Sequence, residues 1–237
     1  GIAKAALSAG AKIYENSAAT SYKVFDDHVR VTTKNGSVKA DRIVLACNGY
    51  LENLEKSLTS KILPMNNYIV ATKPLDDETV QKINPKDIAF ADSRFVINYF
   101  RMSADKRLLF GGGENYSQEL SKNIVPIVTR PLEKIYPFLK GIKIDYAWGG
   151  KLAITMNRLP FFTSLHNEKV ISAQGYSGQG VALASYSGKI VSEKIIGTGE
   201  VFDIMSKIPR PSFPGGRFLR NPSMKIGMLY YSLLDRI

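Results

Sequence analysis

Near its start, the chain alternates apolar and polar residues in a way that predicts short strands. Partial alternation at 19–25 and 28–33 predicts two strands, and Asn35-Gly36 predicts a tight hairpin turn into a third strand. The strand expected at 42–46 contains the unbroken apolar run 43–46, which is typical of a strand buried on both faces, as in a parallel sheet. We therefore expect a small antiparallel meander attached to a buried parallel strand.

After Pro64 the pattern of apolar and polar residues predicts mainly strands. Strand-like runs recur from 65 to 113 and are interrupted by a short helix expected at 76–83. A longer helix is expected at 124–136 and a further strand at 142–149. Strands that follow one another through short turns pair antiparallel, so this middle part predicts a mostly antiparallel sheet.

A buried-strand pattern returns at 169–173, and a long amphipathic helix is expected at 181–196. Two buried-strand segments therefore flank a β-rich middle, as expected when an antiparallel substrate domain is inserted into a nucleotide-binding domain. The expected parts are an incomplete nucleotide-binding domain at 1–63 and 166–201, a substrate-binding domain at 64–165, and a C-terminal extension at 202–237 with a terminal helix at 224–237.

The segment Gly175-Tyr176-Ser177-Gly178-Gln179-Gly180-Val181 is the strongest local motif. It follows an apolar strand and opens a helix. Glycines allow positive φ and a close approach of the backbone to a ligand, and the free N–H groups of a helix start favour an anionic or electron-rich acceptor. The alternative is a turn that only packs strand against helix. The motif matches neither a P-loop nor the dinucleotide-binding fingerprint.

Several segments, in this order and spacing, carry a resemblance to a known family. They are Ala40-Asp41-Arg42-Ile43-Val44-Leu45-Ala46-Cys47-Asn48-Gly49, Tyr99-Phe100-Arg101, 107–112, Trp148-Gly149-Gly150, Asn157-Arg158-Leu159-Pro160, the glycine motif at 175–181 and the tail from 213 to 231. Together they resemble the D-amino-acid oxidase superfamily of flavoenzymes, in the branch of glycine and sarcosine oxidases. The resemblance covers nearly the whole chain.

This resemblance implies an α/β (α+β) protein: an incomplete FAD/NAD(P)-binding domain with an inserted, mostly antiparallel β-sheet substrate domain. It implies non-covalently bound FAD, oxidation of a C–N bond by hydride transfer to the flavin, and oxygen or another electron acceptor. The N-terminal glycine fingerprint of the family is absent from this sequence, which we expect to be the C-terminal part. The alternative is a truncated, non-catalytic chain, or a subunit that needs a partner to complete the flavin site.

Site residues follow from the resemblance position by position. The glycine motif of the family lines the flavin ring, and the turn after the buried strand contacts the adenosine and pyrophosphate. Gln179 stands where the family usually has His. The implied cofactor-binding residues are Gly178, Gln179, Gly180 and Val181 at the ring, Ala46, Cys47 and Gly49 at the adenosine and pyrophosphate, and Ala19 at the adenine.

On the substrate side, Leu152 stands where amino-acid oxidases of the family hold the substrate carboxylate with an arginine. An apolar side chain cannot pair with a buried carboxylate, so the expected substrate is a small-molecule amine that lacks an α-carboxylate. Tyr99, Tyr116 and Trp148 are candidates for facing it, although aromatic side chains also serve as ordinary core residues. No residue is assigned a catalytic role.

Composition narrows the remaining possibilities. The net charge of +11 comes from scattered lysines without an aromatic-basic motif, so no nucleic-acid partner is expected. A single cysteine, Cys47, excludes a disulfide within the chain, and the two histidines, His28 and His166, lack metal-ligand spacing, so no metal is assigned. No apolar run reaches the length of a membrane span, and the cysteine usage favours a reducing, cytoplasmic compartment. His28, beside Asp26-Asp27, is expected to be exposed.

Overall fold

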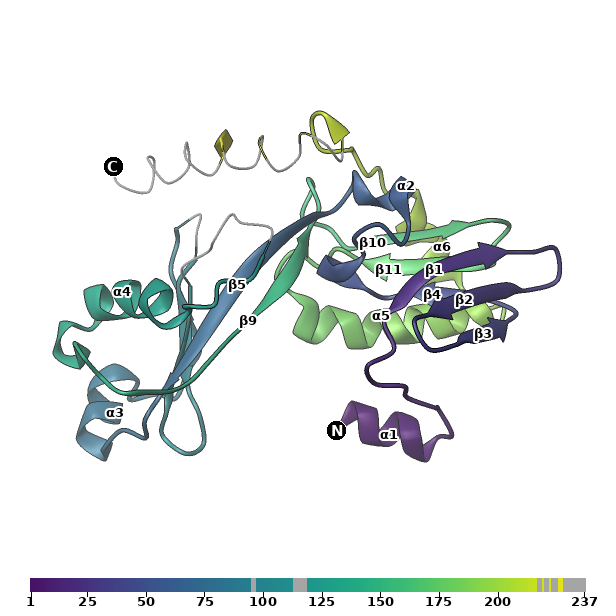
Figure 1. Cartoon of the computed structure of the whole chain (residues 1–237). Coiled ribbons are helices and arrows are strands. Elements are labelled where there is room, and N and C mark those ends of the chain that lie inside the picture. Colours follow the sequence, from purple (N-terminus) through teal and green to yellow (C-terminus); the bar gives the residue numbers. More distant parts are fainter. Residues whose placement is uncertain (95–96, 113–118, 217–218, 220–221, 223–225, 228–237) are drawn as a thin grey trace.

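The computed structural model describes residues 1–94, 97–112, 119–216, 219, 222 and 226–227. Its strands form a five-stranded sheet and two three-stranded sheets, with helices packed on them. Figure 1 shows the five-stranded sheet on one side of the molecule and the smaller sheets on the other, linked by two long strands. The expected α/β (α+β) class is confirmed. The candidate Tyr116 and most of the expected helix at 224–237 lie outside the described residues.

The N-terminal meander forms as its hydrophobic pattern predicts. Strands β1 (Ala19–Val24), β2 (Val29–Thr33) and β3 (Ser37–Ala40) pair antiparallel in that order. The Thr33 amide donates to the carbonyl of Gly36 at 2.8 Å, which closes the hairpin at Asn35-Gly36. The helix that precedes the meander, α1 (Ile2–Ser8), buries none of its residues.

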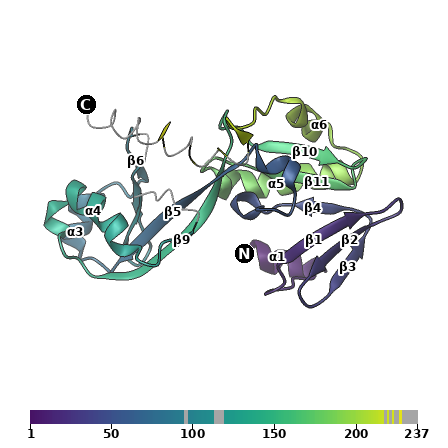
Figure 2. The ribbon, with the colours of Figure 1, turned by 45° about the horizontal axis from the view of Figure 1, so that its top comes forward.

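The second sheet has the order β10-β11-β4 and contains the parallel pair. Its strands are β4 (Ile43–Leu45), β10 (Phe161–Leu165) and β11 (Val170–Gln174), with β4 parallel and β10 antiparallel to β11. Helices α5 (Gly180–Ile195) and α6 (Glu200–Lys207) cover one face, as Figure 2 shows. The short helix α2 (Lys56–Thr59) contributes Leu58 to the core on the other face.

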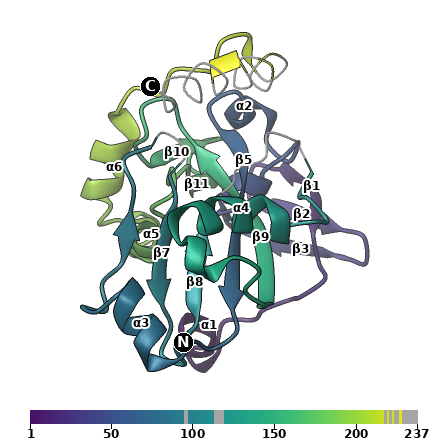
Figure 3. The same cartoon turned by 90° about the vertical axis from the view of Figure 1, so that its left-hand side faces the viewer.

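The five-stranded sheet is antiparallel throughout, with the order β6-β7-β8-β5-β9. Its strands are β5 (Leu63–Thr72), β6 (Phe90–Ala91), β7 (Tyr99–Met102), β8 (Leu108–Gly111) and β9 (Ile144–Ile154). Helices α3 (Asp77–Ile83) and α4 (Val125–Ile135) and the 3₁₀ turn η2 (Pro137–Leu139) pack on one face, around Tyr68, Val70 and Phe110. In Figure 3 these helices lie in front of the sheet.

Two expectations about burial are wrong. The strand at 42–46 is parallel, but β4 is an edge strand and Val44 is 40% exposed, so it is not buried on both faces. His28 is only 9% exposed, because its ring stacks on Phe25 with the centroids 4.4 Å apart and its Nδ1 lies 2.5 Å from an Asp27 carboxylate oxygen. Both errors have the same cause: local sequence does not show which element covers a residue.

Candidate functional site

The parallel strands β4 and β11 bring the two candidate cofactor loops together. Both strands end at the same edge of the sheet, where β4 runs into the 3₁₀ turn η1 (Asn48–Tyr50) and β11 runs into the glycine motif. The Gly175 amide donates to Oδ1 of Asn48 at 3.2 Å, which joins the loops directly. Ligands of open α/β sheets bind outside the carboxyl ends of the strands, and these loops occupy that position.

The glycine motif has the backbone conformation that its composition predicts. Gly175 and Gly178 have φ of +75° and +95°, a region that side chains with a Cβ rarely adopt. In the described part of the chain no side chain caps the N-terminus of α5, and the first residue after Gly180, Val181, is 98% exposed. Backbone N–H groups at such a helix start remain free for an outside acceptor. These residues fit the electron-rich edge of a flavin ring.

Hydrogen bonds attach the glycine motif to the end of β9. The Ser177 amide donates to the carbonyl of Ala153 at 2.9 Å, and the Thr155 amide donates to Oγ of Ser177 at 3.2 Å. The start of α5 is thereby held next to the last residues of a strand that continues into the five-stranded sheet. The cofactor candidates and the substrate candidates therefore belong to one connected region.

One face of the five-stranded sheet is opposite to the face that α3 and α4 cover, and we call it the open face. Directly paired residues of neighbouring strands share a face, and successive residues alternate. Because Tyr68 and Val70 lie in the helix-covered core, their neighbours along β5 lie on the open face. On β5 and β9 the open face carries the pairs Leu63/Ile154, Met65/Leu152, Asn67/Gly150 and Ile69/Trp148.

The three substrate candidates among the described residues, Tyr99, Trp148 and Leu152, lie on the open face. Tyr99 pairs with Gly111, which pairs with Ile69, so Tyr99 is on the same face as Trp148 and Leu152. Its hydroxyl donates to Oδ1 of Asn67 at 2.5 Å. A Cβ on Gly111 would lie 2.2 Å from the Tyr99 ring, so this glycine is what lets the ring lie flat on the sheet.

The end of the open face nearest the glycine motif is apolar. Leu152 packs there with Leu63, Met65 and Ile154. Phe213 of the C-terminal extension packs against the same cluster. Sequence reasoning missed both Phe213 and Asn67. Two adjacent asparagines within a strand pattern could have drawn attention to Asn67, whereas no local signal marks Phe213 in its proline-rich segment.

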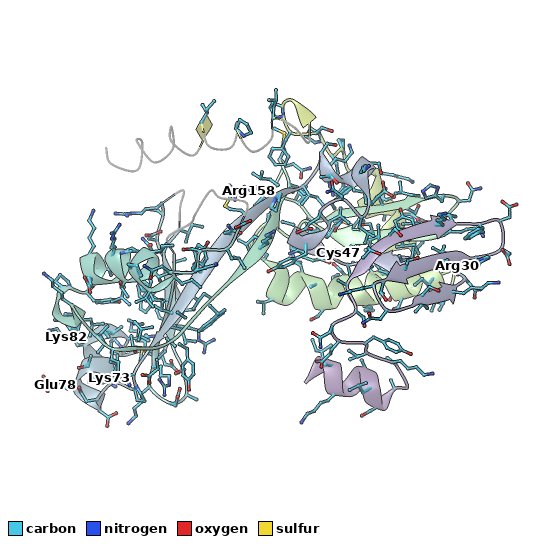
Figure 4. All side chains as sticks on the ribbon, in the orientation of Figure 1. Arg30, Cys47, Lys73, Glu78, Lys82 and Arg158 are labelled. Atoms are coloured by element: carbon cyan, nitrogen blue, oxygen red, sulfur yellow. The ribbon has the colours of Figure 1, made fainter. Side chains whose placement is uncertain are left out.

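The candidate residues for the adenosine and pyrophosphate side differ in burial and in the sheet to which they belong. Gly49 is buried, and a Cβ there would lie 2.5 Å from the carbonyl oxygen of Lys151, so packing of η1 on β9 already requires a glycine. Ala46 is exposed, and Cys47 is half-buried in the part of the molecule that contains β4 (Figure 4). Burial raises the pKa of the Cys47 thiol, which favours the protonated form. Ala19 lies in a different sheet, at the exposed start of β1.

Within the described ranges, no three or more His, Cys, Asp and Glu side chains come together as ligands for a metal ion. None of the helices in those ranges combines the length and the apolar character that a membrane crossing requires.

The chain matches a family model and several known proteins. Residues 1–194 match the family model described as DAO, FAD dependent oxidoreductase. The chain is 39% identical over 236 residues to a probable oxidoreductase OrdL of Rhizobium meliloti, covering 100% of this chain and 54% of that protein. It is 36% identical over 229 residues to the gamma-glutamylputrescine oxidoreductase of Escherichia coli, covering 96% of this chain and 53% of that protein. The chain thus spans about half the length of these relatives.

Solved structures share the fold at lower sequence identity. A glycine oxidase from Bacillus cereus aligns with a TM-score of 0.68 at 18% identity, over 89% of this chain and 58% of that chain. An L-proline dehydrogenase from P. horikoshii aligns with a TM-score of 0.65 at 23% identity, over 81% of this chain and 53% of that chain.

Proposed function

Because the chain belongs to the DAO family of FAD-dependent oxidoreductases, we propose that it supplies the substrate face and part of the flavin site of an enzyme that oxidises the C–N bond of an amine. The observation that carries this proposal is the attachment of the glycine motif to the end of β9, through the bond from the Ser177 amide to the Ala153 carbonyl. It places the uncapped start of α5 at one end of the open face.

Bound FAD supplies the hydride acceptor for such a reaction. The residues of this chain contribute by stabilising negative charge and by offering contacts that position the substrate. The N–H groups at the start of α5 favour negative charge on whatever they bind, because the helix dipole is positive at this end. The Tyr99 hydroxyl, fixed on Asn67, offers a polar contact on the open face, and Trp148, which is 44% exposed, offers an aromatic surface.

We propose a γ-glutamylated amine such as γ-glutamylputrescine as the substrate. One support is the 36% identity to the Escherichia coli gamma-glutamylputrescine oxidoreductase. The other is Leu152, whose apolar side chain packs with Leu63, Met65 and Ile154 and cannot itself pair with a carboxylate on the reacting carbon. The electron acceptor is oxygen or another oxidant.

The test is the visible absorption spectrum of the purified chain, mixed with FAD and then desalted. The proposal expects a flavin band that stays with the protein and is bleached when γ-glutamylputrescine is added without oxygen. Exchange of Gly178 for valine is the matched control, because its φ of +95° excludes a β-branched side chain and the loop must change shape. This variant should retain less flavin.

A second candidate is a chain whose flavin site is completed by another polypeptide segment. The observation in its favour is the edge of β4 that pairs with no strand of the described residues, where Val44 is 40% exposed. This candidate expects a protein that stays colourless with FAD alone and becomes yellow when a segment carrying the glycine fingerprint of a relative is supplied. A chain that stays colourless in both mixtures would count against both candidates.

A further inference from the structure

The C-terminal extension returns to the open face through one aromatic residue. After α6 the chain passes through Pro209 and Pro211, and Phe213 then packs against the apolar cluster of Leu63, Met65 and Ile154. Leu152 packs against that same cluster from within β9. Phe213 is distant in sequence from every strand of the sheet, yet it covers the end of the open face that adjoins the glycine motif.

The segment that carries Phe213 is fixed at several points. The Phe213 amide donates to the carbonyl of Ser60 at 2.9 Å, and Nζ of Lys61 donates to the carbonyl of Arg210 at 2.7 Å. On the other side, Nδ2 of Asn157 donates to the carbonyl of Pro209 at 2.9 Å. Prolines further restrict the backbone, because their rings fix φ. These hydrogen bonds therefore hold the segment that carries Phe213 in place.

Two cations beside this segment donate to backbone carbonyls, although the buried Nε of Arg210 has no hydrogen-bond partner among the described residues. The guanidinium of Arg210 donates to the carbonyls of Pro160 and Ile208, and the ammonium of Lys61 donates to the backbone of Arg210 itself. A carboxylate placed against Leu152 and Phe213 would lose hydration to the apolar side chains of the cluster that both residues join. A chain of methylene groups placed there would give up no hydrogen bonds with water.

We propose that Phe213 is a specificity-determining residue, which forms with Leu152 an apolar wall that rejects an α-carboxylate and accepts the methylene chain of an amine. This inference rests on the proposed function, because it assumes that substrate binds on the open face. It assigns to the C-terminal extension a direct part in substrate selection, in addition to its structural contacts.

The only tryptophan of the chain, Trp148, lies on the same face and reports on binding without turnover. It is four residues from Leu152 along β9, or roughly 13 Å, a distance that an extended γ-glutamylated amine can span. The experiment titrates the full chain, with FAD present, against γ-glutamylputrescine and γ-glutamylornithine while Trp148 fluorescence is recorded. With ornithine joined to the glutamyl group through its δ-nitrogen, these probes differ only by a carboxylate on the carbon that bears the amine of the putrescine or ornithine part. Both keep the amine and carboxylate of the glutamyl part.

The wild-type chain should bind γ-glutamylputrescine at least about tenfold more tightly than γ-glutamylornithine, since an unpaired carboxylate is costly to desolvate. Phe213→Ala should reduce that ratio, and Phe213→Gln should do so while keeping most of the side-chain volume. Phe213→Leu should retain the ratio. The double exchange Leu152→Arg with Phe213→Ala should reverse it, because a guanidinium pairs with the carboxylate. Phe138→Ala, at an exposed aromatic on η2, is the distant control.

The outcomes separate this inference from the function on which it rests. If the wild-type chain responds to the amine but Phe213→Ala and Phe213→Gln, folded by circular dichroism, keep the wild-type ratio, then Phe213 only anchors the extension and the inference is wrong. If the wild-type chain responds to neither probe, the proposed function itself fails and the inference fails with it. A double variant that keeps the wild-type preference would show that neither side chain faces the amine-bearing end of the substrate.

Discussion

The two ends of the molecule differ in how completely their apolar side chains are buried. The first region, the five-stranded sheet with α3 and α4, encloses a core in which Val70, Phe110 and Leu132 are 0% exposed. The second region, the β10-β11-β4 sheet with α5 and α6, has buried residues too, but Val44 is 40% exposed at the β4 edge and Val181 is 98% exposed on α5.

This difference suggests that the residues that stabilise the fold and the residues that would bind the cofactor lie mainly in different regions. The first region provides the open face and supports it with a closed core of its own, whereas the second provides both cofactor loops next to an uncovered strand edge. Unpaired strand edges and exposed apolar side chains favour contact with further polypeptide. We therefore expect the first region to resist unfolding on its own and the second to gain stability from what binds it.

The largest expected effect comes from placing the same charge in both regions. Val70→Asp buries a carboxylate in the closed core and should destabilise the first region by more than about 4 kcal/mol. Val44→Asp places the carboxylate at an exposed strand edge and should cost about 1 kcal/mol or less. Urea unfolding followed by Trp148 fluorescence, which reports on β9 in the first region, measures the first effect, and circular dichroism measures both. Equal losses for the two variants would contradict the comparison.

An ion-pair network in the first region should give a smaller, pH-dependent effect. The Arg107 guanidinium donates to the Asp145 carboxylate at 2.6 Å and to the carbonyl of Thr72 at 2.9 Å, and so joins β9 and β5. This guanidinium, followed by the ammonium of Lys143, holds the pKa of the Asp145 carboxyl below its usual range. Arg107→Leu should therefore lower the urea midpoint of the first region at neutral pH.

The sign of the pH dependence follows from linkage. A carboxyl whose pKa is lower in the folded state than in the unfolded state adds stability above its unfolded pKa of about 3.9. That contribution disappears as the pH falls through the lower, folded value. The difference in urea midpoint between wild type and Arg107→Leu should therefore be full near pH 6 and shrink below about pH 4. A difference that stays constant to pH 2.5 would show that lost packing, and not the ion pair, is responsible. Asp77, an exposed partner of Lys106, provides the control Asp77→Asn, with little effect expected.

Local chemistry explains which parts of the structure the sequence predicts. The hairpin at Asn35-Gly36 and the helix after the glycine motif form because turn type and helix start are decided by a few neighbouring residues. The exposure of Val44 is different, because β4 pairs with β11 on one side and with no strand of the described residues on the other, and no local pattern shows this. The burial of His28 likewise depends on stacking with Phe25.

The candidate site shows the same division. Family resemblance indicated Tyr99, Trp148 and Leu152 one by one, but their position on one face follows from the pairing register of β5, β7, β8 and β9. Register is a long-range property, and a shift by one residue would turn each side chain to the other face. Phe213 reaches the face through contacts with Ser60, far away in sequence, so only the folded chain brings it there.

The smallest predicted effect concerns two glycines, one in the loop before α5 and one within α5. Gly178, in the loop before α5, has φ of +95°, so Gly178→Ala should destabilise the second region by about 1 kcal/mol through backbone strain. Gly188 lies within α5, where an added Cβ would meet nothing within 4 Å, so Gly188→Ala should stabilise it by about 0.5–1 kcal/mol. Thermal or urea unfolding by circular dichroism measures both. If binding of a flavin at the α5 start depends on the loop shape, Gly178→Ala should also weaken FAD retention and Gly188→Ala should leave it unchanged. Equal FAD retention by the two variants would mean that the conformation at Gly178 serves only the packing of β11 against α5.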